Sequence, residues 1–268
     1  MNDLRITLVQ SDIFWEDTPA NLDRYGHLIS RITEPTDLIL LPETFNTGFS
    51  INPALCAEDI HGKTMQFLQR MARSRETTIM TTLLISEDRQ YFNRLICMYP
   101  DGHFETYNKR HLFRLSDEYK LFSPGTTRTV FEVNGWKIFP QICYDLRFPV
   151  WSKNSYDNGV YGYDLLVYLA NWPASRSQVW KTLLPARAIE NQAYVAGVNR
   201  IGPDGHETLH TGDSMVADAK GNLLYNGPGT TEDIRTVTLS AENLRLFREA
   251  FTVGMDWDQF TIKVKTRP

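Results

Sequence analysis

The sequence has no long hydrophobic segment and no block of basic residues. No run approaches the about 18 consecutive apolar residues that a membrane-spanning helix needs. Residues 1–9 read as the start of a strand, without the charged leader and apolar stretch of a signal peptide. The formal net charge of -4 comes from interspersed acidic and basic residues, so no cationic cluster is available to bind phosphates. We therefore expect a cytoplasmic protein without membrane or nucleic-acid partners.

Cysteine is also scarce, because the 268 residues contain only Cys56, Cys97 and Cys143. An odd and sparse set is typical of a reducing compartment, where single thiols rather than disulfides carry function. Cys97 alternates within an apolar run and fits a small buried residue. Cys143 ends an apolar run and charged residues follow it, which is where a strand fixes the backbone and the next turn leaves a side chain accessible. Cys143 is therefore the candidate nucleophile, with a structural role as the alternative.

Strand-like runs recur along the whole chain. They cover residues 5–10, 37–41, 78–85, 94–99, 129–133, 136–142, 164–169 and 193–198. Several are apolar for most of their length, as expected of strands covered on both faces. Asp101-Gly102, Asn134-Gly135 and Lys220-Gly221 lie between such runs and favour hairpins. Hairpins pair strands antiparallel, whereas strands joined by helices pair in parallel. The combination predicts mixed sheets.

Helix-like stretches separate several of these strands. One begins at Thr18, predicted as the cap, with Pro19 in the first turn, and another begins at Thr64. A third covers residues 175–191, where Pro185 is expected to cause a kink. No linker, repeat or low-complexity tract interrupts the chain, so residues 1–268 are expected to form a single domain.

Two more reactive side chains occupy positions comparable to that of Cys143. Glu43 follows an apolar strand and a proline, where a carboxylate can act as a proton acceptor. Lys109 ends the hairpin arm that begins at Phe104, where an ammonium can lower the pKa of a thiol and stabilise negative charge on a carbonyl oxygen. A solvated carboxylate and a surface lysine are the plainer alternatives.

Together these segments resemble the nitrilase superfamily of carbon-nitrogen hydrolases. The matching segments, in chain order, are Pro42-Glu43 with Thr47-Gly48, Tyr107-Asn108-Lys109-Arg110-His111-Leu112, and Cys143-Tyr144-Asp145-Leu146-Arg147-Phe148-Pro149. The resemblance continues through residues 171–173, 186–192 and 212–214. The omega-amidase branch is the most similar, since Tyr144-Asp145 follows the cysteine where true nitrilases carry Trp-Glu.

The resemblance implies an α/β fold, a four-layer αββα sandwich with mixed sheets. It implies a Glu-Lys-Cys triad of Glu43, Lys109 and Cys143, with the backbone amide of Tyr144 as a second oxyanion donor. Hydrolysis of a small linear amide would proceed through a thioester, most simply with the omega-amide of a 2-oxo dicarboxylic acid monoamide such as 2-oxoglutaramate or 2-oxosuccinamate as substrate. This mechanism requires neither a metal nor an organic cofactor.

Further residues receive expected roles from the same resemblance. Glu118, or its neighbour Asp117, would be the second acid near the lysine, with a surface charge as the alternative. Trp172 would shape the pocket, with a core aromatic residue as the alternative. Arg176 would bind the distal carboxylate, whereas Arg147 belongs to the motif and has a structural role as the alternative. Members of the family pair through helices, so a homodimer or larger homo-oligomer is expected, with residues 175–191 contributing to the contact or simply packing on the sheet.

The sequence also permits competing interpretations. His206 and His210 match the zinc-peptidase pattern HExxH, which requires a helix. Gly202-Pro203-Asp204-Gly205 precedes them and Thr211-Gly212 follows, so a polar loop is the prediction. Nitrile hydrolysis, N-carbamoyl hydrolysis and a binding role without catalysis stay open as well.

Overall fold

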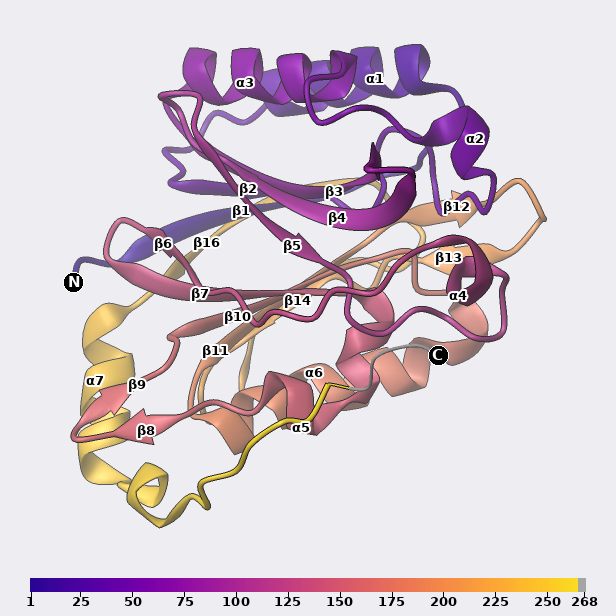
Figure 1. Ribbon diagram of the computed structural model, residues 1–268. Coiled ribbons are helices and arrows are strands. Elements are labelled where there is room, and N and C mark those ends of the chain that lie inside the picture. Colours follow the sequence, from indigo (N-terminus) through magenta and orange to yellow (C-terminus); the bar gives the residue numbers. More distant parts are fainter. Residues whose placement is uncertain (265–268) are drawn as a thin grey trace.

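Two six-stranded sheets stacked face to face form the centre of the molecule (Figure 1). The computed structural model describes residues 1–264, so the last four residues of the predicted 1–268 domain lie outside the described residues. The first sheet has the strand order β16-β1-β2-β3-β4-β5 and the second β15-β14-β11-β10-β7-β6. In each sheet three neighbouring strands are parallel, and antiparallel strands flank them. The predicted mixed pairing is confirmed.

The strands of the first sheet are β1 (Leu4–Gln10), β2 (Leu38–Leu40), β3 (Thr78–Glu87), β4 (Gln90–Met98), β5 (Phe104–Asn108) and β16 (Asp233–Leu239). Those of the second are β6 (Phe131–Val133), β7 (Trp136–Ile142), β10 (Leu165–Ala170), β11 (Tyr194–Asn199), β14 (Met215–Ala217) and β15 (Leu223–Asn226). Two short hairpins lie outside the sheets, formed by β8 (Tyr156–Asp157) with β9 (Val160–Tyr161) and by β12 (Ile201–Pro203) with β13 (Leu209–Thr211).

Helices cover the outer faces of both sheets, so that the order of layers is αββα (Figure 1). The first sheet is covered by α1 (Thr18–Ser30) and α3 (Lys63–Arg75), and the second by α6 (Ser177–Asn191) with the short α5 (Pro149–Ser152). The remaining helical segments are α2 (Pro53–Cys56), α4 (Glu118–Leu121), α7 (Ala241–Ala250), η1 (Cys143–Arg147), η2 (Ala174–Arg176) and η3 (Val253–Asp256). The predicted four-layer fold is confirmed. Within residues 1–264 no helix is long and apolar enough to cross a membrane.

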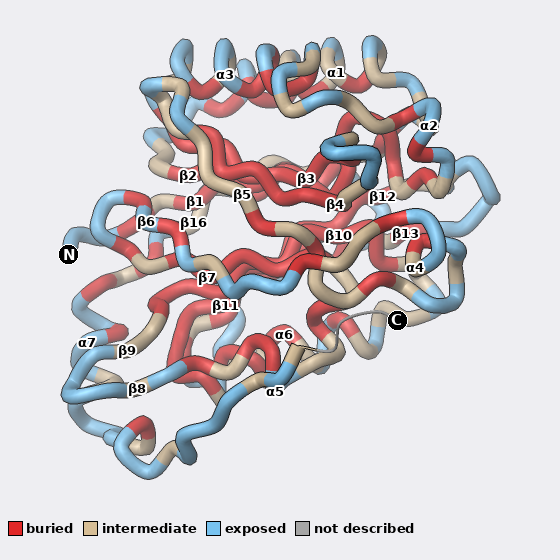
Figure 2. Tube along the Cα trace, in the orientation of Figure 1, coloured by how far each residue is buried: buried red, intermediate tan, exposed pale blue. Residues whose placement is uncertain are grey.

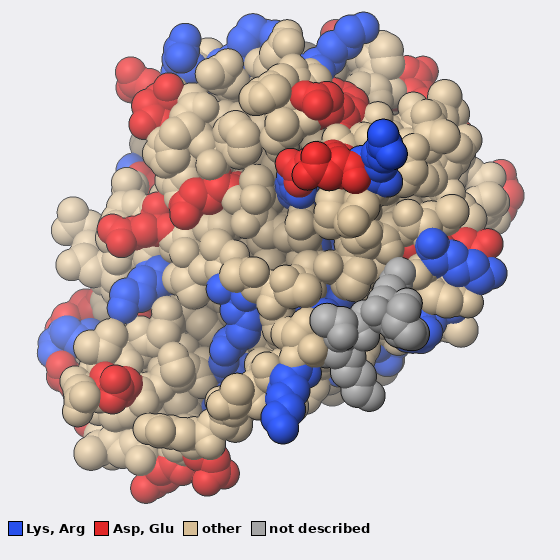
Figure 3. Space-filling model, in the orientation of Figure 1, with Lys and Arg blue, Asp and Glu red and all other residues tan. Residues whose placement is uncertain are grey.

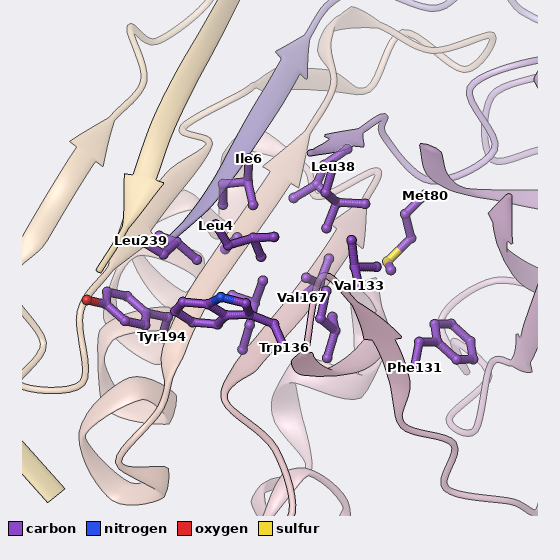
Figure 4. Close-up of a cluster of buried hydrophobic side chains, with 14 of the residues drawn as sticks. Leu4, Ile6, Leu38, Met80, Phe131, Val133, Trp136, Val167, Tyr194 and Leu239 are labelled. Carbon is purple, nitrogen blue, oxygen red and sulfur yellow. The ribbon is translucent and has the colours of Figure 1, made fainter. Parts of the chain in front are cut away.

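Apolar side chains fill the spaces between the layers. Between the sheets, Leu4, Ile6, Leu38 and Met80 from the first meet Val133, Trp136, Val167 and Tyr194 from the second (Figure 4). Separate apolar clusters lie under α1 and α3 and under α6. Every residue of β10 is buried, because one face of the strand meets the other sheet and the opposite face meets a helix (Figure 2). Full burial of a Val or Leu side chain stabilises the fold by about 1.5–3 kcal/mol.

Most of the predicted strands lie within one or two residues of their observed bounds. Asn134 and Gly135 both have positive φ (50° and 77°), as a two-residue hairpin turn between β6 and β7 requires. The predicted cap of α1 is wrong by one residue: the side chain of Asp17, not Thr18, accepts from the backbone N–H of Ala20 at 3.1 Å. Helix α3 begins at Lys63, one residue before the predicted start. Pro185 lies inside α6.

Candidate active site

The three predicted catalytic residues come together at one end of the two sheets. Glu43 comes shortly after β2, Lys109 directly follows β5, and Cys143 directly follows β7. All three line one cavity of about 280 Å³. Two of the strands belong to the first sheet and one to the second, so the site exists only because the sheets stack.

Lys109 lies between two buried carboxylates. Its Nζ is 2.9 Å from Oε1 of Glu43 and 2.9 Å from Oε1 of Glu118, and at most 1% of any of the three side chains is exposed. Burial alone would lower the pKa of Lys109, but Glu118 and Glu43 together raise this pKa above its ordinary value. Lys109 is therefore an ammonium at neutral pH.

Glu43 is held by donors on several sides. Its Oε1 also accepts from Nδ2 of Asn93 at 2.8 Å, and its Oε2 accepts from the backbone N–H of Asn171 at 2.8 Å. The amide of Asn171 also donates to the carbonyl oxygen of Glu43 at 2.6 Å. Neither asparagine was predicted as a site residue. Asn93 was detectable only as a polar residue in an otherwise largely apolar strand, and Asn171 only through its place in the 171–173 match.

Cys143 occupies a strained turn at the cavity. It is the first residue of η1 and has φ of 41°, a left-handed conformation that non-glycine residues adopt at a cost of about 1–3 kcal/mol. Its Sγ lies 3.9 Å from the carbonyl oxygen of Asn171. Burial and the charge of Glu43 raise the pKa of the Cys143 thiol well above its ordinary value, although Lys109 acts in the opposite direction. Lys109 thus lowers this pKa as predicted, but burial and Glu43 outweigh it, and the sulfur carries its proton until a base removes it.

Of the two candidates for the second acid, only Glu118 reaches the site. Its Oε1 accepts from Lys109, and its Oε2 accepts from the backbone N–H of Phe113 at 2.6 Å. Burial raises the pKa of Glu118. Asp117 instead points to solvent and pairs with Lys120 at 2.8 Å.

Aromatic rings and two arginines form the walls of the cavity. The guanidinium of Arg147 lies 5.2 Å from the ring centre of Trp172, and that of Arg176 lies 5.3 Å from the ring centre of Phe113. Within residues 1–264 neither guanidinium forms an ion pair with a carboxylate. The indole of Trp172 donates to the carbonyl oxygen of Arg176 at 2.8 Å, which fixes the start of α6.

Tyr144 and the rest of η1 complete the cavity wall beside the sulfur. The ring of Tyr144 packs edge-on against Phe113 and Phe148, with centroids 5.2 Å and 5.0 Å away. The N–H groups in the first turn of a helix have no acceptor within that helix, so the N–H of Tyr144 is available to a ligand. It can therefore serve as the expected second oxyanion donor.

The HExxH segment does not form the helix that its zinc-binding interpretation needs. Residues 204–208 connect β12 and β13 in a hairpin, so His206 lies in the loop and His210 in β13, and both histidines line the cavity. His206 is exposed, whereas burial and the charge of Arg200 lower the pKa of His210 to about 4, so its ring is neutral at physiological pH. The described residues contain no cluster of His, Cys, Asp and Glu suited to a metal ion.

The fold and this cysteine site define a class of enzyme. The carbon-nitrogen hydrolase family matches residues 5–249, so the chain belongs to that family, and the predicted resemblance is confirmed.

Charged side chains of both signs are interspersed over the face seen in Figure 3.

Particular relatives are similar over almost their full length. The omega-amidase YafV of Yersinia enterocolitica is 41% identical over 98% of this chain and 100% of its own, and the 2-oxoglutaramate amidase of Bacillus subtilis is 30% identical over 94% and 96%. A crystal structure of a CN-hydrolase superfamily protein from Xanthomonas campestris, with an arsenic adduct in its active site, has a TM-score of 0.96, 41% identity and coverage of 98% and 100%.

Proposed function

We propose that this enzyme hydrolyses the omega-amide of a 2-oxo dicarboxylic acid monoamide, such as 2-oxoglutaramate or 2-oxosuccinamate, and releases ammonia. The observation that carries the proposal is one cavity with two kinds of group. Its reactive part holds Cys143 beside the buried Glu43–Lys109 pair, and its walls carry two arginines without carboxylate partners among residues 1–264. The similarity to omega-amidases and 2-oxoglutaramate amidases supports the same substrate class.

In the first half of the reaction, Glu43 takes the proton from the Cys143 thiol and the sulfur attacks the amide carbon. The carbonyl oxygen becomes an oxyanion, which the ammonium of Lys109 and the N–H of Tyr144 stabilise. One such donor contributes about 3–4 kcal/mol to a transition state. Glu43 then gives its proton to the leaving nitrogen, the carbon-nitrogen bond breaks, and ammonia leaves a thioester on Cys143.

In the second half, Glu43 removes a proton from a water molecule that attacks the thioester carbon. The same two donors stabilise the second oxyanion. The carbon-sulfur bond breaks and the sulfur takes the proton back from Glu43, so that the acid is released and the enzyme is restored. Glu118 keeps Lys109 charged and in place through both halves, because it bonds the same ammonium.

The arginines would bind the other end of the substrate. A 2-oxo acid carries a carboxylate next to a carbonyl group, and guanidinium groups form strong, directed hydrogen bonds with both. We propose Arg176 as the main partner of this carboxylate and Arg147 as the second. Trp172, on which Arg147 stacks, forms the wall along the carbon chain.

The remaining expectations are also proposals: one hydrolase domain over the chain, a cytoplasmic location, and a homodimer or larger homo-oligomer. Support for the dimer comes from Val150 on α5 and Ile189 on α6, which expose apolar side chains (59% and 55%) on the outer helical layer. Sedimentation velocity that finds a monomer at micromolar concentration would contradict it.

An ammonia-release screen tests the proposed reaction. The compounds are 2-oxoglutaramate, 2-oxosuccinamate, glutamine, simple nitriles and N-carbamoyl amino acids, each with the native enzyme and with Cys143→Ala. We expect turnover of the two keto amides, and none with Cys143→Ala. Inert keto amides together with turnover of a nitrile or carbamoyl compound would show that the substrate class is wrong. Turnover that persists in Cys143→Ala would show that the nucleophile is wrong.

A further inference from the structure

We propose that Asp145 is a positioning residue that holds the Cys143 turn against the segment that carries Lys109. The inference deepens the proposed function and rests on it. Asp145 is fully buried and lies two residues after Cys143, but it does not line the cavity. Any effect it has on the reaction must therefore pass through other residues.

One oxygen of Asp145 holds the nucleophile turn. Its Oδ2 accepts from the backbone N–H of Ile142, the residue before Cys143, at 3.1 Å. The carbonyl oxygen of Asp145 accepts from the N–H of Phe148 at 3.0 Å, which closes the turn on its other side. Asp145 thus accepts hydrogen bonds from backbone groups on both sides of the strained Cys143.

The same carboxylate also holds both sides of Lys109. Oδ1 accepts from the backbone N–H of His111 at 2.9 Å and lies 2.7 Å from its ring Nδ1, and Oδ2 accepts from the hydroxyl of Tyr107 at 2.8 Å. Tyr107 lies two residues before Lys109 and His111 two residues after it. A single buried carboxylate therefore joins the turn of the nucleophile in one sheet to the lysine arm of the other.

Neighbouring side chains fix the junction, by which we mean the contacts that Asp145 makes with Ile142, Tyr107 and His111. The hydroxyl of Tyr107 accepts from the indole N–H of Trp151 at 2.9 Å, so its own proton is directed to Asp145. The ring of His111 stacks on Phe148 with centroids 3.7 Å apart. Strained backbone such as that of Cys143 persists only where the surroundings over-determine it. Displacement of a reacting group by about 1 Å can reduce a rate about 100-fold.

Asp145→Asn removes one of the two acceptor oxygens with the least change in shape. An asparagine has one carbonyl oxygen, whereas backbone N–H groups approach both oxygens of Asp145. In either orientation, the N–H of Ile142 or that of His111 faces an NH₂ group and loses its acceptor. One side of the junction must therefore be released.

Asp164→Asn is the matched control. Asp164 is also buried, accepts from the backbone N–H of Lys137 at 3.1 Å and pairs with Arg248 at 2.6 Å. It directly precedes β10, at the opposite end of the second sheet from Cys143. Loss of this carboxylate also removes a buried acceptor, but at a place far from the reacting groups.

The test measures ammonia release from 2-oxoglutaramate and the rate of Cys143 alkylation by iodoacetamide across pH, with both variants kept well below their Tm. For Asp145→Asn we expect kcat to fall about 100-fold, KM to change less than about threefold, and alkylation to slow about 10-fold or more. Asp164→Asn should lower Tm and leave kcat and alkylation within about twofold of the native values.

Equal kinetic losses in both variants, or native kinetics in Asp145→Asn, would overturn the proposal. Should Asp145→Asn fail to fold, Tyr107→Phe removes one donor from the lysine side and should slow alkylation several-fold, and an unchanged rate would again overturn it. If the native enzyme is alkylated rapidly but does not hydrolyse keto amides, the proposed substrate is wrong. The role of Asp145 is then decided by the alkylation rates of Asp145→Asn and Asp164→Asn relative to that of the native enzyme.

Discussion

The proposed role of Glu43 as the base can be tested by a single substitution. The thiol of Cys143 keeps its proton because burial raises its pKa, so attack needs a base within reach. Glu43→Gln preserves the shape but cannot accept that proton, and we expect kcat to fall about 100-fold to 10,000-fold. Ammonia release by the purified variant measures this. Glu105→Gln, on β5 but outside the cavity, should retain native activity, and a Glu43→Gln enzyme with native kcat would contradict the assignment.

Arg176 tests the recognition of the substrate rather than the reaction. Arg176→Ala removes a guanidinium that stacks on Phe113 and, among residues 1–264, has no carboxylate partner. A charge-assisted hydrogen bond contributes about 1.5–3 kcal/mol, so KM for 2-oxoglutaramate should rise about 10-fold to 100-fold with little change in kcat. Steady-state kinetics measure both. Arg128→Ala, an arginine that stacks on Phe139 outside the cavity, should leave KM unchanged. A native KM in Arg176→Ala would remove this residue from the substrate site.

The raised pKa of Cys143 also predicts how stability depends on pH. Above the ordinary thiol pKa of about 8.5 the unfolded chain loses this proton while the folded chain keeps it. The stabilising contribution is thus complete below that pH and is lost as pH rises, with a slope of at most about 1.4 kcal/mol per pH unit. Urea unfolding between pH 7 and 10 should show a smaller loss of stability in Cys143→Ala than in the native enzyme. Equal losses would mean that the thiol ionises normally in the folded protein.

Among the elements, α1 offers a test of how its first turn is capped. The structure places Asp17 at the N-cap, although the sequence pattern favoured Thr18 because Pro19 follows it. Asp17→Ala should reduce the free energy of unfolding by about 1 kcal/mol, since the N–H of Ala20 loses its acceptor. Chemical denaturation measures the change. Thr18→Ala is the neighbouring control, and a larger loss in that variant would restore the original assignment.

Elements with strong local signals were predictable, and those without them were not. The strand cores 136–142 and 164–169 are largely apolar because both of their faces are covered. Strand β16 was missed: it forms an edge beside β1, only Leu239 in it is buried, and its polar residues do not stand out from a loop. Hairpin β12–β13 was likewise read only as a loop, because glycine and proline dominate its start.

At the scale of the whole molecule, the order of Glu43, Lys109 and Cys143 along the chain predicted the site, but its supporting residues follow from the stacking of the sheets. Asn93, Asn171 and Asp145 make their contacts across the sheets or between separate segments. No local pattern encodes such contacts. The choice between Glu118 and Asp117 was open for the same reason, since the path of one loop decided which carboxylate reached Lys109.

The central claim is that a thioester forms on Cys143 inside this buried cluster. Mass spectrometry of enzyme quenched within milliseconds of mixing with 2-oxoglutaramate tests it most directly. We predict an acyl adduct on the peptide that contains Cys143, which decays as the acid is released and is lost on treatment with hydroxylamine. Turnover of the substrate with no adduct on this peptide, or with an adduct on Cys56 or Cys97 instead, would contradict the account.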